Sequence, residues 1–282
     1  MVARTIALSD GTTIPQIGFG VWQVKPDETE VAVAAALEAG YRHVDTAQMY
    51  RNEAGVGAAV AASSLNRDDV YITSKVNNNA HAPEETRASV ARTLELLQSD
   101  HVDLMLIHWP LAMHPEGFVD AYRVLVEEQA AGRIRSIGVS NFHAAHLDAV
   151  IEATGVAPVV NQIEVHPYFA NPAVADTQAR GIVVQAWSPL ASGKLFGDPV
   201  VEAVAAEVGA TPAQTVLAWH LAAGRIILPK SVTPSRIVEN LASGDVVLSD
   251  DQIARIDALD RGEEGRTGPD PDTMDWRPAA HS

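Results

Sequence analysis

Four ionisable side chains lie at or just beyond the ends of β-rich segments in this 282-residue chain, and they are Asp45, Tyr50, Lys75 and His108. The ordinary pKa of a tyrosine hydroxyl is about 10. A nearby ammonium lowers that pKa by stabilising the phenolate, so Lys75 is expected to make Tyr50 a better acid. Asp45 would hold Lys75 charged, and His108 would hydrogen-bond the substrate oxygen. Together they favour protonation of an oxygen as negative charge builds on it, as in the reduction of a carbonyl by hydride.

Each of these residues alone also has a structural interpretation. Asp45 could cap a turn, Lys75 could be a surface charge, and His108 could be a hydrogen-bonded core histidine. Tyr50 could be an amphipathic loop residue. Their placement after successive strands is what indicates a shared site.

The chain alternates short β-rich runs with longer helical ones. The expected strands are 14–20, 41–46, 69–75, 102–108, 134–141, 158–165, 182–188 and 225–231. The expected helices are 28–40, 52–63, 83–98, 117–132, 143–155, 172–181, 198–209, 211–224 and 234–243, with an extra helix at 249–259. The tail that follows is rich in glycine and proline and is expected to be irregular.

Eight strand–helix units without a linker predict an α/β fold, the (β/α)8 TIM barrel. The competing fold is a doubly wound sheet, whose G-x-G-x-x-G fingerprint is absent because Gln23 stands where the third glycine belongs. In a barrel, the carboxyl ends of the strands meet at one rim, and that rim carries the active site.

Composition excludes several other classes. The chain has no cysteine, which rules out disulfides and thiol chemistry. Its net charge of −16 disfavours nucleic acid and anionic membranes as partners. No apolar run reaches the length of a membrane span, and the start lacks an apolar signal core, so we expect a cytoplasmic protein.

Five longer motifs make the chain resemble the aldo-keto reductase superfamily. They are GYRHVDTAQMYRNEAGVG (40–57), VDLMLIHWP (102–110), SIGVSNF (136–142), VVNQIEVHP (159–167) and IILPKSVTPSRIVENL (226–241). Within that superfamily the chain is most similar to the prokaryotic 2,5-diketo-gluconate reductase-like branch. The resemblance implies one barrel domain over 1–282, with an N-terminal β-hairpin, an extra C-terminal helix and a tail at 260–282 that closes the substrate pocket. It also implies a monomer that reduces aldehydes, ketones or dicarbonyls with NADPH.

The resemblance assigns roles by position. Tyr50 would be the general acid, Lys75 its partner, Asp45 the anchor of Lys75, and His108 the group that orients the carbonyl. The implied cofactor contacts are Ser140, Asn141, Gln162, Trp187, Ser188, Leu190, Ser192, Lys230, Ser231, Val232, Thr233, Arg236 and Asn240.

Two of these positions bear on the choice of cofactor. Lys230 and Arg236 flank an expected helix start, where cations and backbone N–H groups can hold the 2′-phosphate of NADP(H). We therefore expect NADPH, with NADH as a weaker alternative. Taken alone, Arg236 would be read as a surface charge on a helix.

The chain departs from the family pattern after the third expected strand. Asn77 stands where the family often has a bulky aromatic, which predicts a wider or more polar substrate pocket. Trp22, Trp109 and Trp276 are candidate pocket walls, with core packing or tail anchoring as the alternative. Residues 274–277 are the expected tail contacts.

Two other functions compete with reduction. One is a nicotinamide-binding sensor without turnover, which would have no need of the four ionisable residues together. The other is a barrel hydrolase that uses Asp45 and Glu164 as a carboxylate pair, or a metal held by His108 and His166. A lysine beside the carboxylate suits neither version of the hydrolase, so no metal is expected.

Overall fold

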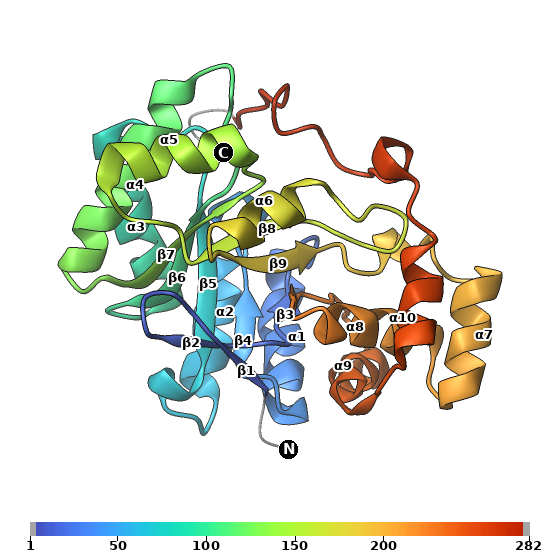
Figure 1. Cartoon of the computed structure of the whole chain (residues 1–282). Coiled ribbons are helices and arrows are strands. Elements are labelled where there is room, and N and C mark those ends of the chain that lie inside the picture. The colour runs from blue at the N-terminus through green and yellow to red at the C-terminus, as the bar shows by residue number, and fades with distance from the viewer. Residues whose placement is uncertain (1–3, 279–282) are drawn as a thin grey trace.

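The computed structural model describes residues 4–278 and contains the predicted barrel (Figure 1). Its eight strands are parallel and neighbour one another in chain order. They are β3 (Phe19–Gly20), β4 (His43–Asp45), β5 (Tyr71–Val76), β6 (Val102–Ile107), β7 (Ile134–Ser140), β8 (Val160–Glu164), β9 (Val183–Trp187) and β10 (Ile226–Ile227). Backbone hydrogen bonds from Gly18 N to Ile227 O (2.8 Å) and from Ile227 N to Gln16 O (3.0 Å) join the last strand to the first and close the sheet.

The helices surround the sheet and match the predicted ones within a few residues. They are α1 (Pro26–Ala39), α2 (Glu53–Ala62), α3 (Pro83–Leu97), α4 (Pro115–Ala130), α5 (Ala144–Thr154), α6 (Ala173–Ala179), α7 (Pro199–Val208), α8 (Pro212–Ala222), α9 (Pro234–Leu241) and α10 (Asp250–Asp257). Prolines open most of them, as expected of a residue that has no N–H to leave unpaired in the first turn.

Strand β6 explains why the buried strands lack polar–apolar alternation. Leu104 and Leu106 belong to a cluster with Leu8 and Ile14 from the N-terminal segment, whereas Met105 and Ile107 belong to the large cluster under the helices. Successive side chains point to opposite faces of a strand, and here both faces are covered. A continuous apolar run results.

The predicted first strand, 14–20, is divided between two elements. Its start belongs to β2 (Thr13–Pro15), which pairs antiparallel with β1 (Thr5–Ala7) in the N-terminal hairpin. Only β3 joins the barrel sheet. Pro15 supplies no N–H and ends the hairpin strand, so the chain can turn into the barrel.

Beyond α10 the chain has one short 3-10 helix, η5 (Gly262–Gly265), and is otherwise irregular through residue 278, as predicted. This tail runs from α10 across one end of the barrel toward α4 and α5 (Figure 1). Residues 1–3 and 279–282 of the predicted domain lie outside the described residues. Within 4–278, no helix has both the length and the apolar character needed to cross a membrane.

Candidate active site

The four predicted catalytic side chains meet at the carboxyl ends of neighbouring strands. Asp45 is the last residue of β4, Lys75 lies in β5, and His108 directly follows β6. Tyr50 ends a 3-10 helix, η1 (Gln48–Tyr50), in the loop after β4. Strand order alone therefore brings together residues that lie up to 63 positions apart.

The centre of the group is a buried ion pair. Lys75 Nζ donates to Asp45 Oδ1 at 2.7 Å and to the Thr46 carbonyl at 2.8 Å, and the Lys75 side chain is fully buried. Burial lowers the pKa of Lys75 and raises that of Asp45, while the attraction between the two charges opposes both shifts. Gln162 Nε2 donates to the other Asp45 oxygen at 2.7 Å, so both carboxylate oxygens have partners.

Tyr50 is the third partner of the ammonium. Lys75 Nζ lies 3.4 Å from Tyr50 Oη. Burial raises the pKa of Tyr50 well above its ordinary value, and the charge of Asp45 adds to this shift. The predicted lowering of this pKa is therefore wrong, because burial, with the charge of Asp45 added to it, sets the direction of the shift. The hydroxyl keeps its proton, which is the state that a proton donor requires.

His108 lies next to Tyr50. Its ring lies edge-on to the Tyr50 ring, with the two centroids 5.6 Å apart. Burial, followed by the charge of Lys75, lowers the pKa of His108 well below its ordinary value. The imidazole is therefore neutral at physiological pH and can donate one hydrogen bond to an oxygen beside Tyr50.

A cavity of about 1160 Å³ opens above this group. Asp45, Tyr50 and His108 line one part of it, whereas Lys75 is fully buried and contacts Asp45 and Tyr50. The other predicted residues that line it are Trp22, Trp109, Ser140, Asn141, Gln162, Trp187, Ser188, Leu190, Ser192, Lys230, Ser231, Arg236, Asn240 and Trp276. Ligand pockets usually measure ~300–1,000 Å³, so this cavity has room for a dinucleotide and a small substrate.

A linked set of polar side chains lies next to the ionisable group. Asn141 Nδ2 donates to the His108 carbonyl and to Ser140 Oγ, both at 3.0 Å, and Trp187 Nε1 donates to Asn141 Oδ1 at 2.8 Å. Asn141 has the left-handed backbone angle φ +63°, which asparagine tolerates better than most residues. Gln162 Oε1 accepts no hydrogen bond from residues 4–278, so it can receive an N–H from a ligand.

Near the start of α9 the cavity wall carries two cations, Lys230 and Arg236, and one carboxylate, Glu239. Lys230 and Arg236 are exposed and form no ion pair with any residue that the structure describes. Ser231 Oγ accepts from Thr233 N at 3.0 Å and shapes the turn into α9. Two predicted contacts, Val232 and Thr233, are exposed here and do not line the cavity.

Asn77 is also absent from the lining residues. Its Oδ1 accepts from Asn78 N at 2.9 Å, and Asn78 Nδ2 in turn donates to the Trp276 carbonyl at 2.9 Å. This segment holds the tail, and the tail brings Trp276 into the cavity wall. The polar side chain at 77 thus adds no polar surface to the pocket.

Several lining residues were not predicted. They include Met49, Lys194, Phe196, Thr211 and Glu239. Lys194 and Phe196 follow the predicted contact Ser192 in the loop after β9, and Glu239 precedes the predicted contact Asn240. Proximity in sequence to a predicted residue was a signal for four of them, but Thr211 lies far along the chain from every predicted contact and had none.

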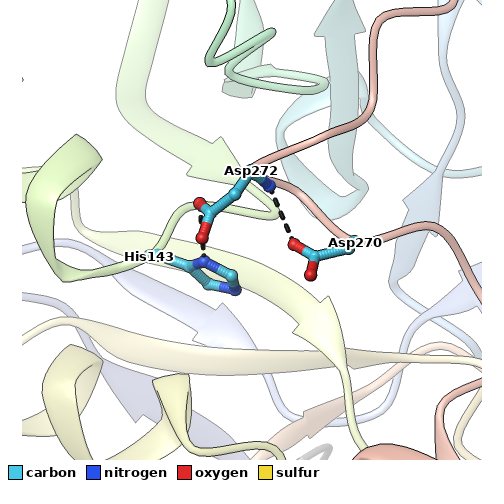
Figure 2. Close-up of side chains that lie close together, drawn as sticks. All are labelled: His143, Asp270 and Asp272. Carbon is cyan, nitrogen blue, oxygen red and sulfur yellow. Dashed lines mark hydrogen bonds and ion pairs between the residues drawn. The ribbon is translucent and has the colours of Figure 1, made fainter.

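The residues proposed for hydrolysis are engaged elsewhere. Glu164 accepts from His166 Nε2 at 3.0 Å and from two residues of the tail, while Asp45 is paired with Lys75. Among the side chains that the structure describes, the one cluster of three metal-ligating groups is His143, Asp270 and Asp272, on the surface (Figure 2). It contains neither His108 nor His166.

The comparisons with known proteins agree with this geometry. A sequence profile of the Aldo/keto reductase family matches residues 16–261. A Mycolicibacterium smegmatis protein named aldo-keto reductase is 46% identical over 272 residues, covering 96% of this chain and 98% of that protein. Methylglyoxal reductase DkgA of Escherichia coli is 44% identical over 270 residues, or 95% of this chain and 96% of that protein. The crystal structure of a Gox0644 mutant in complex with NADPH has a TM-score of 0.93 and 40% identity, covering 98% of this chain and all of that one.

This chain therefore belongs to the aldo/keto reductase family and is an oxidoreductase. Its relatives include methylglyoxal reductases of the 2,5-diketo-gluconate reductase-like branch, so the predicted family and branch are confirmed. The general activity that follows is reduction of carbonyl groups.

Proposed function

We propose that this protein reduces aldehydes, ketones or dicarbonyls to alcohols, with NADPH as the hydride donor and Tyr50 as the proton donor. The observation that carries the proposal is the position of Lys75 Nζ, 2.7 Å from Asp45 and 3.4 Å from Tyr50 Oη at the base of the cavity. A buried ammonium beside a neutral phenol stabilises the phenolate that forms when the proton leaves.

The cavity fits a dinucleotide. Ser140, Asn141 and Gln162 offer hydrogen-bonding groups for a carboxamide, and Trp187 offers a flat surface beside them. Near the start of α9, Lys230 and Arg236 offer positive charges that pair with no acidic group among the described residues, which suits the 2′-phosphate of NADPH. When bound, the reduced nicotinamide supplies the hydride. NADH has no phosphate for these cations, so we expect it to be a weaker donor.

The side chains divide the remaining work. His108 donates a hydrogen bond to the substrate oxygen and fixes its direction. Tyr50 transfers its proton to the same oxygen as charge builds there, and Lys75 stabilises the phenolate left behind. Asp45 keeps Lys75 charged in an environment whose burial favours the neutral amine. Because one chain supplies all these groups, we propose that the protein acts as a monomer. We also propose that the chain forms a single domain, in which the tail from residue 260 onward completes the substrate pocket.

A cofactor and substrate screen tests this function. Purified protein is mixed with NADPH or NADH and methylglyoxal, aromatic aldehydes, quinones or keto-sugars, and absorbance at the nicotinamide band is followed. We expect turnover with NADPH and a preference for NADPH over NADH. Arg236→Ala should reduce that preference by about tenfold, because it removes one charge-assisted contact with the 2′-phosphate. Tight NADPH binding without turnover on any carbonyl would favour the sensor function instead.

A further inference from the structure

Glu164 is a buried carboxylate that the proposed chemistry does not use. It is the last residue of β8 and is 2% exposed. Such a group needs partners, because an unpaired buried charge is costly. Within 4–278 it forms no ion pair with lysine or arginine. Its partners are His166 and the backbone and hydroxyl groups of the C-terminal tail, 103 and 104 positions further along the chain.

The contacts with the tail are specific. Glu164 Oε1 accepts from Thr267 N at 2.7 Å and from the Thr267 hydroxyl at 2.5 Å, and Oε2 accepts from Gly268 N at 3.0 Å. Hydrogen bonds to a carboxylate are about twice as strong as neutral ones. Burial opposes the ionisation of Glu164, but the hydrogen bonds from His166, Thr267 and Gly268 outweigh it and lower the pKa of Glu164. The side chain is therefore a charged anchor for the tail.

The anchored segment lies directly on Trp187. A Cβ atom added at Gly268 would be 2.4 Å from the outer edge of the Trp187 ring, so only glycine fits between Glu164 and the indole. The other side of the indole is held by its Nε1 hydrogen bond to Asn141. Thr267, Gly268 and Trp187 all line the cavity, together with Met274 and Trp276 further along the tail.

A second contact holds the tail through residues that do not line the cavity. His143 directly precedes α5, and its Nδ1 lies 2.9 Å from Oδ1 of Asp272 in the tail. Both side chains are on the surface (Figure 2). His146 Nε2 lies 3.6 Å from the same oxygen. This contact does not touch Trp187, so it provides a comparison for the Glu164 anchor.

We propose that Glu164 is a positioning residue that holds the tail against Trp187. In this way it fixes the position of the indole that faces the cofactor and the position of the tail segment that faces the substrate. The proposal rests on the proposed function for its kinetic consequences only. Release of the tail itself is measurable without any turnover. Because Glu164 contacts none of the four ionisable residues, its loss should affect binding rather than the proton-transfer step.

Glu164→Gln tests the proposal. The amide keeps one acceptor but places an NH2 group opposite the N–H of Gly268, so the anchor is broken with little change in volume. We expect amide hydrogen exchange across residues 266–276 to speed up by about tenfold or more. We also expect the Kd for NADPH and the KM for the carbonyl each to rise by about tenfold, which is the effect of losing one hydrogen bond to a carboxylate. The kcat should stay within about twofold of wild type.

Matched control variants distinguish this positioning role from a general loss of stability. Glu207→Gln makes the same substitution at an exposed glutamate on α7 and should leave exchange in the tail and both constants unchanged. Asp272→Asn should speed exchange around residue 272 but leave residues 267 and 268 protected. If Glu164→Gln does not fold, Gly268→Ala provides a second test, because its added Cβ would lie 2.4 Å from the Trp187 ring and 3.2 Å from Glu164 Oε2 while the carboxylate itself is kept. This variant should raise the Kd for NADPH about tenfold by itself.

Unchanged exchange in the tail of folded Glu164→Gln would overturn the anchor, and so would lost turnover with normal exchange and normal NADPH affinity. In Gly268→Ala, an unchanged Kd for NADPH would overturn the link to Trp187. A wild-type protein that reduces no carbonyl would instead refute the proposed function, while the exchange measurement would still decide the anchor.

Discussion

At the scale of single residues, the chemistry of the site depends on which groups accept hydrogen bonds from the buried ammonium of Lys75. Lys75 Nζ has three partners: Asp45, the Thr46 carbonyl and Tyr50. The shortest goes to the carboxylate and the longest to the phenol, so Asp45 offsets much of the positive charge that Tyr50 would otherwise experience. The ammonium becomes fully effective for Tyr50 only when negative charge appears on the phenol oxygen.

Replacing the counter-ion should therefore disable the site in a pH-dependent way. In Asp45→Asn, the buried ammonium loses its partner and the pKa of Lys75 falls further, because burial is no longer opposed by that charge. We predict kcat lower by about 10²–10⁴ near pH 7.5. The residual rate should rise as the pH is lowered from 8 to 6, because acid restores the ammonium.

The check is a pH–rate profile of both proteins, with thermal unfolding measured alongside, since breaking a buried pair costs about 3–5 kcal/mol. A folded Asp45→Asn variant with a wild-type rate and profile would show that Lys75 does not need this partner.

At the scale of elements, close backbone contacts fix how the helices pack against one another. Gly57 lies in α2, and a Cβ atom there would be 2.6 Å from the Leu96 carbonyl oxygen and 2.7 Å from the Leu97 carbonyl carbon of α3. These contacts are with backbone, which cannot rotate away. The two helices must therefore separate if any side chain is added, and α2 begins three residues after Tyr50.

We predict that Gly57→Ala lowers the free energy of unfolding by about 1–3 kcal/mol, although alanine favours helix more than glycine does. Chemical denaturation measures this, with Ala61→Ser on the exposed face of the same helix as the control. A Gly57→Ala variant as stable as the wild type would mean that α2 and α3 adjust more freely than their contact indicates.

The alternation of strands and helices could be predicted from the sequence because each element carries its own local pattern of apolar spacing, proline starts and glycine ends. Strand order then places Asp45, Lys75 and His108 at one rim. Contacts between distant segments could not be predicted in this way. The sequence around Glu164 gives no sign that its partners are Thr267 and Gly268. Likewise, the direction in which the pKa of Tyr50 shifts depends on burial, which only the folded chain provides.

At the scale of the whole molecule, buried neutral histidines link folding to pH. Burial lowers the pKa of His43 to about 3 and that of His81 to about 4. An unfolded histidine binds its proton near pH 6.5. Between these values the unfolded chain holds more protons than the folded one, so the free energy of unfolding falls as the pH drops through this window.

We predict that lowering the pH from 7.5 to 5 costs about 2 kcal/mol of stability for each such histidine. Denaturant unfolding at a series of pH values measures the loss, and His81→Gln should lessen it by about that amount. Equal pH dependence in the variant and the wild type would show that His81 is protonated as readily in the folded state as in the unfolded one.

The most direct test of the whole account is the rate of NADPH oxidation by Tyr50→Phe, because this change removes one hydroxyl and keeps the ring that packs edge-on to His108. With methylglyoxal or an aromatic aldehyde as substrate, we predict a fall in kcat of about 10²–10⁴ and a Kd for NADPH within about twofold of wild type. Turnover by Tyr50→Phe at the wild-type rate would contradict the assignment of Tyr50 as the proton donor, and with it the role given to Lys75.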